Sequence, residues 1–155
     1  MNVKTLLSMR IDRRAVAAVF FRDLHMEHAQ VRHLHSKPQS ANESAIAFIR
    51  WLITRFSPDA VVFEKIDAEE EYRRVALSGI LLETVRSEAL PVFDATKNDL
   101  FVAYSIPPLA SRKSLREIAS TLWPALAAKG SSVLLLDAAA LGLYTQAERL
   151  LAQDV

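Results

Sequence analysis

With 155 residues, 51% of them hydrophobic, the chain predicts a single domain over residues 1–155 and excludes two domains of ordinary size. Its 19 basic and 18 acidic residues give a formal charge of +1, so any electropositive surface has to be local. The absence of cysteine excludes disulfides and thiolate metal sites and fits a cytoplasmic protein, and no stretch approaches the roughly 20 apolar residues that cross a membrane.

The first third of the sequence predicts three consecutive strands. Residues 3–11 and 15–22 are apolar and rich in β-forming residues, and residues 26–35 alternate more weakly. Short connections between such runs indicate an antiparallel meander. A helix is expected next, over about 42–56, where apolar residues recur at helical spacing after the loop SKPQSANES.

The remaining sequence alternates between strands and helices. The segment AVVFEKI predicts a buried strand, and an acidic start followed by an apolar stripe predicts a helix over about 68–89. The strand LPVFDA follows, then a loop near residue 107 and helices over about 111–127 and 137–152. This order predicts an α/β fold, with a mixed sheet flanked by helices.

Three acidic residues stand at the ends of apolar stretches. Asp12 follows TLLSMRI, Glu64 follows AVVF, and Asp137 follows SSVLLL. A carboxylate at the edge of a buried element costs desolvation energy, which a divalent cation bound by several such groups can offset. The pattern therefore favours a metal-dependent phosphodiester-cleaving site. The alternative is that each acid only caps a helix or faces water.

The order of elements and three segments resemble the RuvC group of Holliday-junction resolvases, within the ribonuclease-H-like superfamily, over nearly the whole chain. The segment RRVALSGILLETVRSEALPVFDATKNDL is similar to the family's long helix and the Leu-Pro-Val-Phe strand after it. The segment SRKSLREIASTL is similar to a family helix that opens with a lysine, here Lys113. The segment DAAALGLYTQA is similar to the helix that carries the last metal ligand, here Asp137.

The resemblance implies a ribonuclease-H-like fold, with a five-stranded sheet of three antiparallel and then two parallel strands. It also implies an endonuclease that cleaves branched DNA with two Mg²⁺ or Mn²⁺ ions. Asp12, Glu64 and Asp137 are the expected catalytic and metal-binding residues. RuvC-type enzymes act as two-fold dimers, so the resemblance implies a homodimer, and the apolar stretch around Gly79 suits close packing of helices.

The site itself departs from the family pattern, so the resemblance implies a partly degenerate active site. A gapless comparison places Arg10 at the family's first aspartate, with Asp12 two residues further on and on the same strand face. A hairpin shortened by two residues would return Asp12 to the ligand position. A further ligand of the family falls at Leu134, which cannot coordinate Mg²⁺.

Two functions therefore remain open from the sequence. One is an active metal-dependent nuclease that uses Asp12, Glu64 and Asp137. The other is a catalytically degraded relative that keeps the fold to bind DNA or a protein partner. In this second case Arg10 would neutralise Glu64 and Asp137 by ion pairing.

Contacts with nucleic acid require local basic groups. Candidates occur beside the expected first hairpin and at the start of a later helix, and they are Arg10, Arg13, Arg14, Arg112 and Lys113. Arg116 is expected to be an ordinary surface charge. Four histidines at positions 25, 28, 33 and 35 suggest a metal cluster, but no cysteine or acidic set completes it, so structural or solvent-exposed roles are expected.

Overall fold

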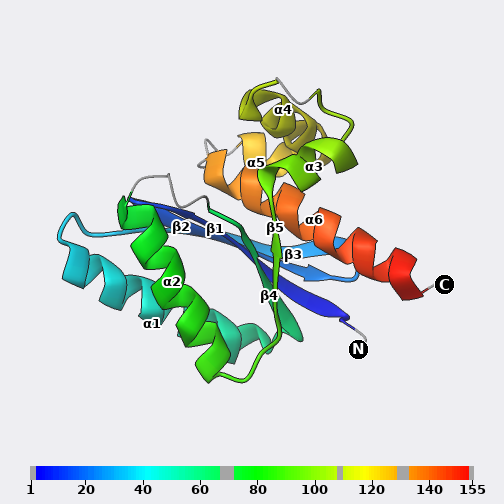
Figure 1. Ribbon diagram of the computed structural model, residues 1–155. Helices are drawn as coiled ribbons and strands as arrows, with labels where there is room; N and C mark the ends of the chain where they lie inside the picture. The colour runs from blue at the N-terminus through cyan, green and yellow to red at the C-terminus, as the bar shows by residue number, and fades with distance from the viewer. Residues whose placement is uncertain (1–2, 67–71, 108–109, 129–132, 154–155) are drawn as a thin grey trace.

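A five-stranded mixed sheet forms the centre of the computed structural model, which describes residues 3–66, 72–107, 110–128 and 133–153. The strand order is β3-β2-β1-β4-β5; the first three strands are antiparallel, and β4 and β5 run parallel to β1 (Figure 1). The strands are β1 (Thr5–Asp12), β2 (Ala15–Arg22), β3 (His25–His33), β4 (Ala60–Glu64) and β5 (Val92–Ala95). The α/β class and the mixed five-stranded sheet predicted from the sequence are confirmed.

Helices cover both faces of this sheet (Figure 1). On one face lie α1 and α2; α6 crosses the other face, with the shorter helices packed near its beginning. The bounds are α1 (Pro38–Phe56), α2 (Tyr72–Ser87), α3 (Lys97–Ala103), α4 (Arg112–Leu122), α5 (Pro124–Ala128) and α6 (Val133–Gln153). Among the described residues, no helix is long and apolar enough to span a membrane.

The alternation of side chains along β1 decides what each face of the sheet carries. Leu7, Met9 and Ile11 belong to the core under α1 and α2. Residues two apart on a strand share a face, so Ser8, Arg10 and Asp12 are directed toward the α6 side. The Ser8 hydroxyl donates to the carbonyl of Ala138 at 2.7 Å, which ties β1 to the first turns of α6.

Close packing of α6 on the sheet depends on Gly142. A Cβ at this position would overlap the ring of Phe21 and lie 3.0 Å from Cβ of Ser8. The missing side chain therefore lets the helix backbone approach β1 and β2. This approach brings the N-terminal half of α6, including Asp137, over the strand that carries Arg10.

Several predicted helix boundaries are wrong, each for a local reason. The helix expected from residue 42 begins at Pro38, because proline is tolerated in the first turn. The helix expected over 111–127 is divided between α4 and α5 before Pro124, since proline disrupts a helix interior. Asp137 lies inside α6 rather than at its start. The helix start predicted near residue 68 lies outside the described residues.

Candidate functional site

The pairing of β1 with β4 determines which residue stands beside Glu64. These strands are parallel, and the register pairs Met9 with Phe63. The next residue on each strand is Arg10 on β1 and Glu64 on β4. The register thus agrees with the gapless reading of the sequence, and an arginine occupies the position where the family resemblance expects an aspartate.

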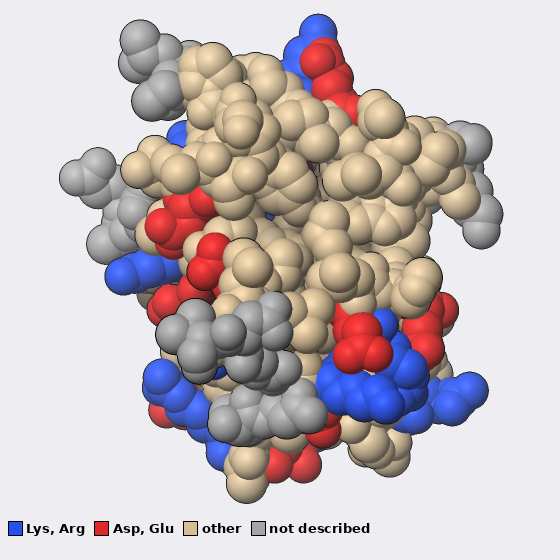
Figure 2. All heavy atoms as spheres, turned by 90° about the vertical axis from the view of Figure 1, so that its right-hand side faces the viewer, with Lys and Arg blue, Asp and Glu red and all other residues tan. Residues whose placement is uncertain are grey.

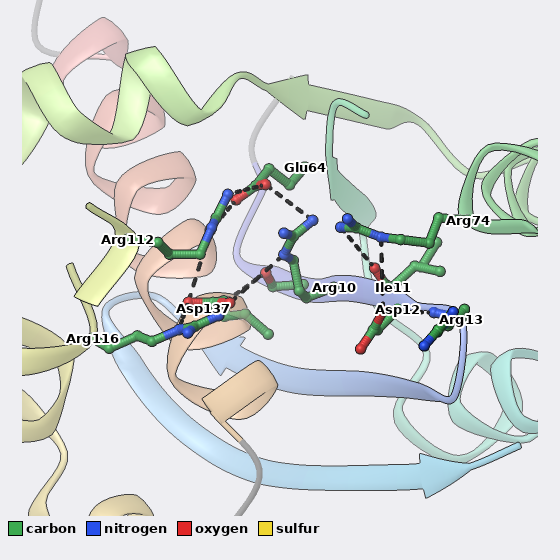
Figure 3. A network of polar contacts seen from close by, with 11 residues as sticks. Arg10, Ile11, Asp12, Arg13, Glu64, Arg74, Arg112, Arg116 and Asp137 are labelled. Carbon is green, nitrogen blue, oxygen red and sulfur yellow. Dashed lines mark hydrogen bonds and ion pairs between the residues drawn. The ribbon is translucent and has the colours of Figure 1, made fainter. Parts of the chain in front are cut away.

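Arg10 points into the space between two buried carboxylates (Figure 3). Its Nη1 lies 3.0 Å from Oε2 of Glu64, and its Nε lies 3.8 Å from Oδ2 of Asp137. The side chains of Arg10, Glu64 and Asp137 are only 7%, 4% and 0% exposed. This guanidinium therefore links β1, β4 and α6 through charge in a largely dry environment.

Arg112, the first residue of α4, covers Glu64 from the solvent side. Its Nη1 and Nη2 donate to Oε1 and Oε2 of Glu64 at 2.9 and 2.6 Å, which is a bidentate pair. Its Nη1 also lies 3.8 Å from Oδ1 of Asp137. Arg112 was predicted to contact nucleic acid, yet in the structure its guanidinium forms this internal ion pair.

Arg116 makes the equivalent contact with Asp137. Its Nε and Nη2 donate to Oδ1 and Oδ2 at 3.1 and 3.0 Å. Arg112 and Arg116 are four residues apart on α4, so both reach the carboxylates from one face of that helix. We call Arg10, Glu64, Arg112, Arg116 and Asp137 the arginine centre; in it three guanidiniums face two carboxylates.

Burial lowers the pKa of the Arg10 guanidinium below its ordinary value. The carboxylate of Glu64 has the next largest effect and raises this pKa, Arg112 lowers it, Asp137 raises it, and Arg74 lowers it. An arginine side chain stays protonated in proteins, so the centre keeps its charges. Arg112 and Arg116 each make a two-point pair with a carboxylate, so both acids are compensated without a metal ion, although Nε of the buried Arg10 has no hydrogen-bond partner among the described residues.

The arginine centre does not fit a divalent cation. Mg²⁺ needs free carboxylate oxygens and room for its waters. Both oxygens of Glu64 and both oxygens of Asp137 accept hydrogen bonds from arginines, and Arg10 occupies the space between the two acids. Among the described residues, no group of three acidic or histidine side chains is arranged to hold a metal ion.

Asp12 does not join Glu64 and Asp137, so the predicted three-carboxylate site is not formed. Asp12 pairs with Ala15 in a hairpin that turns through Arg13 and Arg14, and it lies two residues, about 7 Å, beyond Arg10 along β1. Its side chain is 49% exposed; it accepts the Arg13 amide at 2.8 Å and lies 3.9 Å from Nε of Arg74 (Figure 3). The register of this hairpin and of β4 therefore leaves Arg10, not Asp12, beside Glu64.

The other predicted nucleic-acid contacts divide between surface and interior. Arg13 and Arg14 are exposed at the turn after β1, and Lys113 is exposed on α4. Arg10, also predicted to contact DNA, is only 6% exposed, and its ion pair with Glu64 holds it inside the protein. Leu134, at the other departure from the family pattern, lies in the first turn of α6 and is buried in the core.

Two arginines of the site were missed from the sequence. Arg116 was expected to be an ordinary surface charge, although its spacing of four from Arg112 placed both on one helix face. Arg74 reaches back from α2 and donates to the carbonyl of Ile11 at 3.4 Å, beside Asp12. No local pattern indicates the Arg74 contact, because it joins residues 63 positions apart.

No protein-family model matches this sequence, and no curated protein matches it significantly. Solved structures of Holliday junction resolvases are similar in fold. RuvC of Thermus thermophilus has a TM-score of 0.74 and 14% identity, over 94% of this chain and 96% of that one. The yeast mitochondrial Holliday junction resolvase has a TM-score of 0.68 and 12% identity, over 95% of this chain and 80% of that one. The fowlpox virus resolvase has a TM-score of 0.64 and 13% identity, over 93% of this chain and 99% of that one.

These matches establish a RuvC-like resolvase fold, as the sequence resemblance predicted. They span nearly the full length of this chain and most or all of each solved one. At 12–14% identity they describe the backbone, so the activity has to be argued from the side chains of the site.

Proposed function

We propose that this chain is a RuvC-like domain that binds branched DNA and has lost metal-dependent cleavage. The observation that carries the proposal is the place of Arg10, buried between Glu64 and Asp137. A cation fixed there repels a divalent ion and uses the carboxylates that would bind it. The arginine centre then acts as an internal ion-pair network that joins β1, β4, α4 and α6.

Branched DNA is the ligand that the fold supports best. T. thermophilus RuvC in complex with a Holliday junction substrate has a TM-score of 0.72, over 94% of this chain and 95% of that one. The exposed basic groups Arg13, Arg14 and Lys113 belong to the turn after β1 and the start of α4, the elements that flank the arginine centre. Such groups bind phosphates through charge and counterion release, without the need for a metal.

The active nuclease is the second candidate. It is favoured by Glu64 and Asp137, which retain the positions that the family resemblance assigns to metal ligands and face the same space. Arg112 and Arg116 are 17% and 31% exposed, so these two side chains have solvent to move into. Arg10 has no such freedom, because its side chain is 7% exposed.

One assay separates the two candidates. Purified protein is incubated with a labelled four-way junction and millimolar Mg²⁺ or Mn²⁺, and binding and strand cleavage are followed in the same sample. We expect binding that weakens steeply with salt, and no cleavage product, for both the wild type and Glu64→Gln. Cleavage by the wild type that Glu64→Gln abolishes would establish the nuclease instead. Absence of junction binding would favour the protein-binding alternative.

A homodimer formed through α2 is part of the proposal. The outward face of α2 carries Tyr72, Ala76, Gly79, Glu83 and Arg86, all exposed and spaced by three or four. A Cβ at Gly79 would meet no atom within 4 Å, so this face is open. Small residues in its middle permit close helix approach, and a two-fold axis would bring Glu83 of one protomer near Arg86 of the other. Sedimentation of the wild type and Gly79→Trp tests this: the variant should be monomeric.

A further inference from the structure

A second basic cluster lies next to the arginine centre and has a different character. It lines a pocket of about 430 Å³ between the turn after β1, the end of β3 and the beginning of α2. We call it the turn pocket, and its polar lining residues are Arg13, Arg14, His33, His35, Ser36 and Arg73. The proposed function already uses Arg13 and Arg14 as exposed basic groups, but it assigns no role to the pocket that they form with His35, Ser36 and Arg73.

The fold brings three elements together to form the turn pocket. The hairpin register pairs Ala15 with His33, which places the residues after β3 beside the turn at Arg13 and Arg14. The amide of Leu34 donates to the carbonyl of Arg14 at 2.8 Å and fixes this neighbourhood. Arg73 reaches in from α2, and its Nη2 donates to the carbonyl of His35 at 3.4 Å.

The arginines of the turn pocket form no ion pair with an acid among the residues that the structure describes. Within the described ranges, no carboxylate forms an ion pair with Arg13, Arg14 or Arg73, and Asp12, which adjoins the turn, contacts the Arg13 amide and Arg74 instead. Two guanidiniums from the turn and one from α2 therefore face one pocket, and no described carboxylate offsets their mutual repulsion. An anion in the pocket would remove that repulsion.

The turn pocket presents donors rather than acceptors. The backbone amide of Lys37 donates to Nδ1 of His35 at 3.0 Å, so the proton of the neutral ring is on Nε2. Together with the guanidiniums, this N–H makes the lining a set of donors, to which the Ser36 hydroxyl can add another. A ligand with several acceptor oxygens and negative charge satisfies such a set, and a phosphate group has this chemistry.

The opposite end of the molecule lacks this arrangement. Figure 2 shows the end where β1 begins and α6 ends, and there basic side chains lie among acidic ones over a largely uncharged surface. The Arg22 and Glu27 pair, at 2.9 Å, is one such neutralised contact near that end. That end of the molecule thus mixes basic and acidic groups, whereas the charged lining residues of the turn pocket are all basic.

We infer that the turn pocket binds a phosphate group, and that this group is a backbone phosphate of DNA held next to the arginine centre. The inference about DNA rests on the proposed function, whereas binding of a phosphate group does not. A free phosphate ester has the same chemistry as a backbone phosphate, so the experiment includes both sources.

The first arm uses pyrophosphate and calorimetric titration. The double variant Arg13→Gln/Arg14→Gln removes two guanidiniums from the exposed turn, and Arg50→Gln/Arg55→Gln makes the same charge change on the exposed part of α1. We expect saturable binding by the wild type and the control, and a loss of about tenfold or more in the turn variant. Equal binding by all three proteins would overturn the inference. Arg73→Gln, on a separate element, should weaken binding as well.

The second arm uses a four-way junction over a range of salt concentrations. Each lost phosphate contact reduces the slope of log K against log salt by about 0.9, so the turn variant should lose roughly 2 and the control nothing. This result assigns the backbone of DNA as the source. If the wild type binds pyrophosphate but no junction, the proposed function fails, the phosphate site stands, and a free phosphate ester is its ligand. Equal slopes for the two double variants on a bound junction would overturn the assignment to DNA.

Discussion

The arginine centre and the turn pocket contain the same kind of side chain at the same edge of the sheet, but they use it differently. In the centre, Arg10, Arg112 and Arg116 are held by two buried carboxylates. In the turn pocket, Arg13 and Arg14 are exposed and no described carboxylate pairs with them. A buried cation with partners supports the fold, whereas an exposed cation without them is available to a ligand.

The comparison predicts its largest effect for stability when a carboxylate of the centre is removed. Glu64→Gln removes the closest described acid of Arg10 and Arg112 and leaves Asp137, at 3.8 Å from each; breaking a buried pair in this way costs about 3 to 5 kcal/mol. Urea denaturation measures the loss. Glu88→Gln is the matched control, because Glu88 forms an exposed pair with Arg50 and its loss should cost less than about 1 kcal/mol. Similar losses for the two variants would contradict the internal role of the centre.

A second prediction reverses the chemistry of the centre. Arg10→Asp combined with Arg112→Gln places a third carboxylate beside Glu64 and Asp137 and removes two cations, so the variant should gain saturable Mn²⁺ binding. Mn²⁺ at 100 times its dissociation constant would raise the free energy of unfolding by about 2.7 kcal/mol, which thermal unfolding detects. Arg10→Asn with Arg112→Gln is the control without the third carboxylate. No difference in Mn²⁺ binding between the two variants would show that the position of Arg10 in the arginine centre is not a latent metal site.

Asp59 lies outside both regions, and its substitution should have a smaller effect on stability that depends on pH. The amide of Thr5, and also that of Lys4, donates to its carboxylate at 3.0 Å, and the Thr5 amide has the largest effect in lowering the pKa of Asp59 below 3.8. A carboxylate whose pKa is lowered in the folded state stabilises the protein at pH values above its ordinary pKa. This contribution is lost as the pH falls through the folded-state pKa. Solvent screens this exposed carboxylate, so Asp59→Asn should cost less than about 1 kcal/mol at pH 7 and nothing in strong acid. A cost that persists in acid would contradict this assignment.

The smallest predicted effect has the opposite sign and belongs to the turn pocket. Arg14→Gln removes one of three neighbouring cations, so at low ionic strength it should stabilise the protein by about 0.5 kcal/mol. Unfolding in low and high salt measures this, and the gain should vanish in high salt. Destabilisation at low salt would mean that Arg14 supports the fold, which would remove the contrast between the two regions.

The fold was predictable because its signals are local. Apolar runs marked the strands, and the order of elements gave the mixed sheet. α3 was missed because seven residues are too few for a helical period, although Thr96 and Asp99 form a capping box at its start. The apolar residues before Asp137 were taken as a buried stretch leading to a helix, but they are themselves helical and packed on the sheet.

The site was predictable only in part. Glu64 and Asp137 converge as expected, and the gapless reading correctly placed Arg10 between them. The sequence could not decide between Arg10 and Asp12, because both lie on one strand face and the length of the hairpin sets which one meets Glu64. The contacts of Arg74 and Arg116 depend on how helices dock on the sheet, and no short spacing encodes that docking.

A manganese titration of the wild-type protein, read by the electron paramagnetic resonance signal of free Mn²⁺, tests the central claim most directly. If Arg10 closes the space between Glu64 and Asp137, the signal should follow the added metal up to millimolar concentration, and Glu64→Gln should behave in the same way. A saturable loss of signal in the wild type that Glu64→Gln abolishes would show a metal ion bound at the centre and contradict the account.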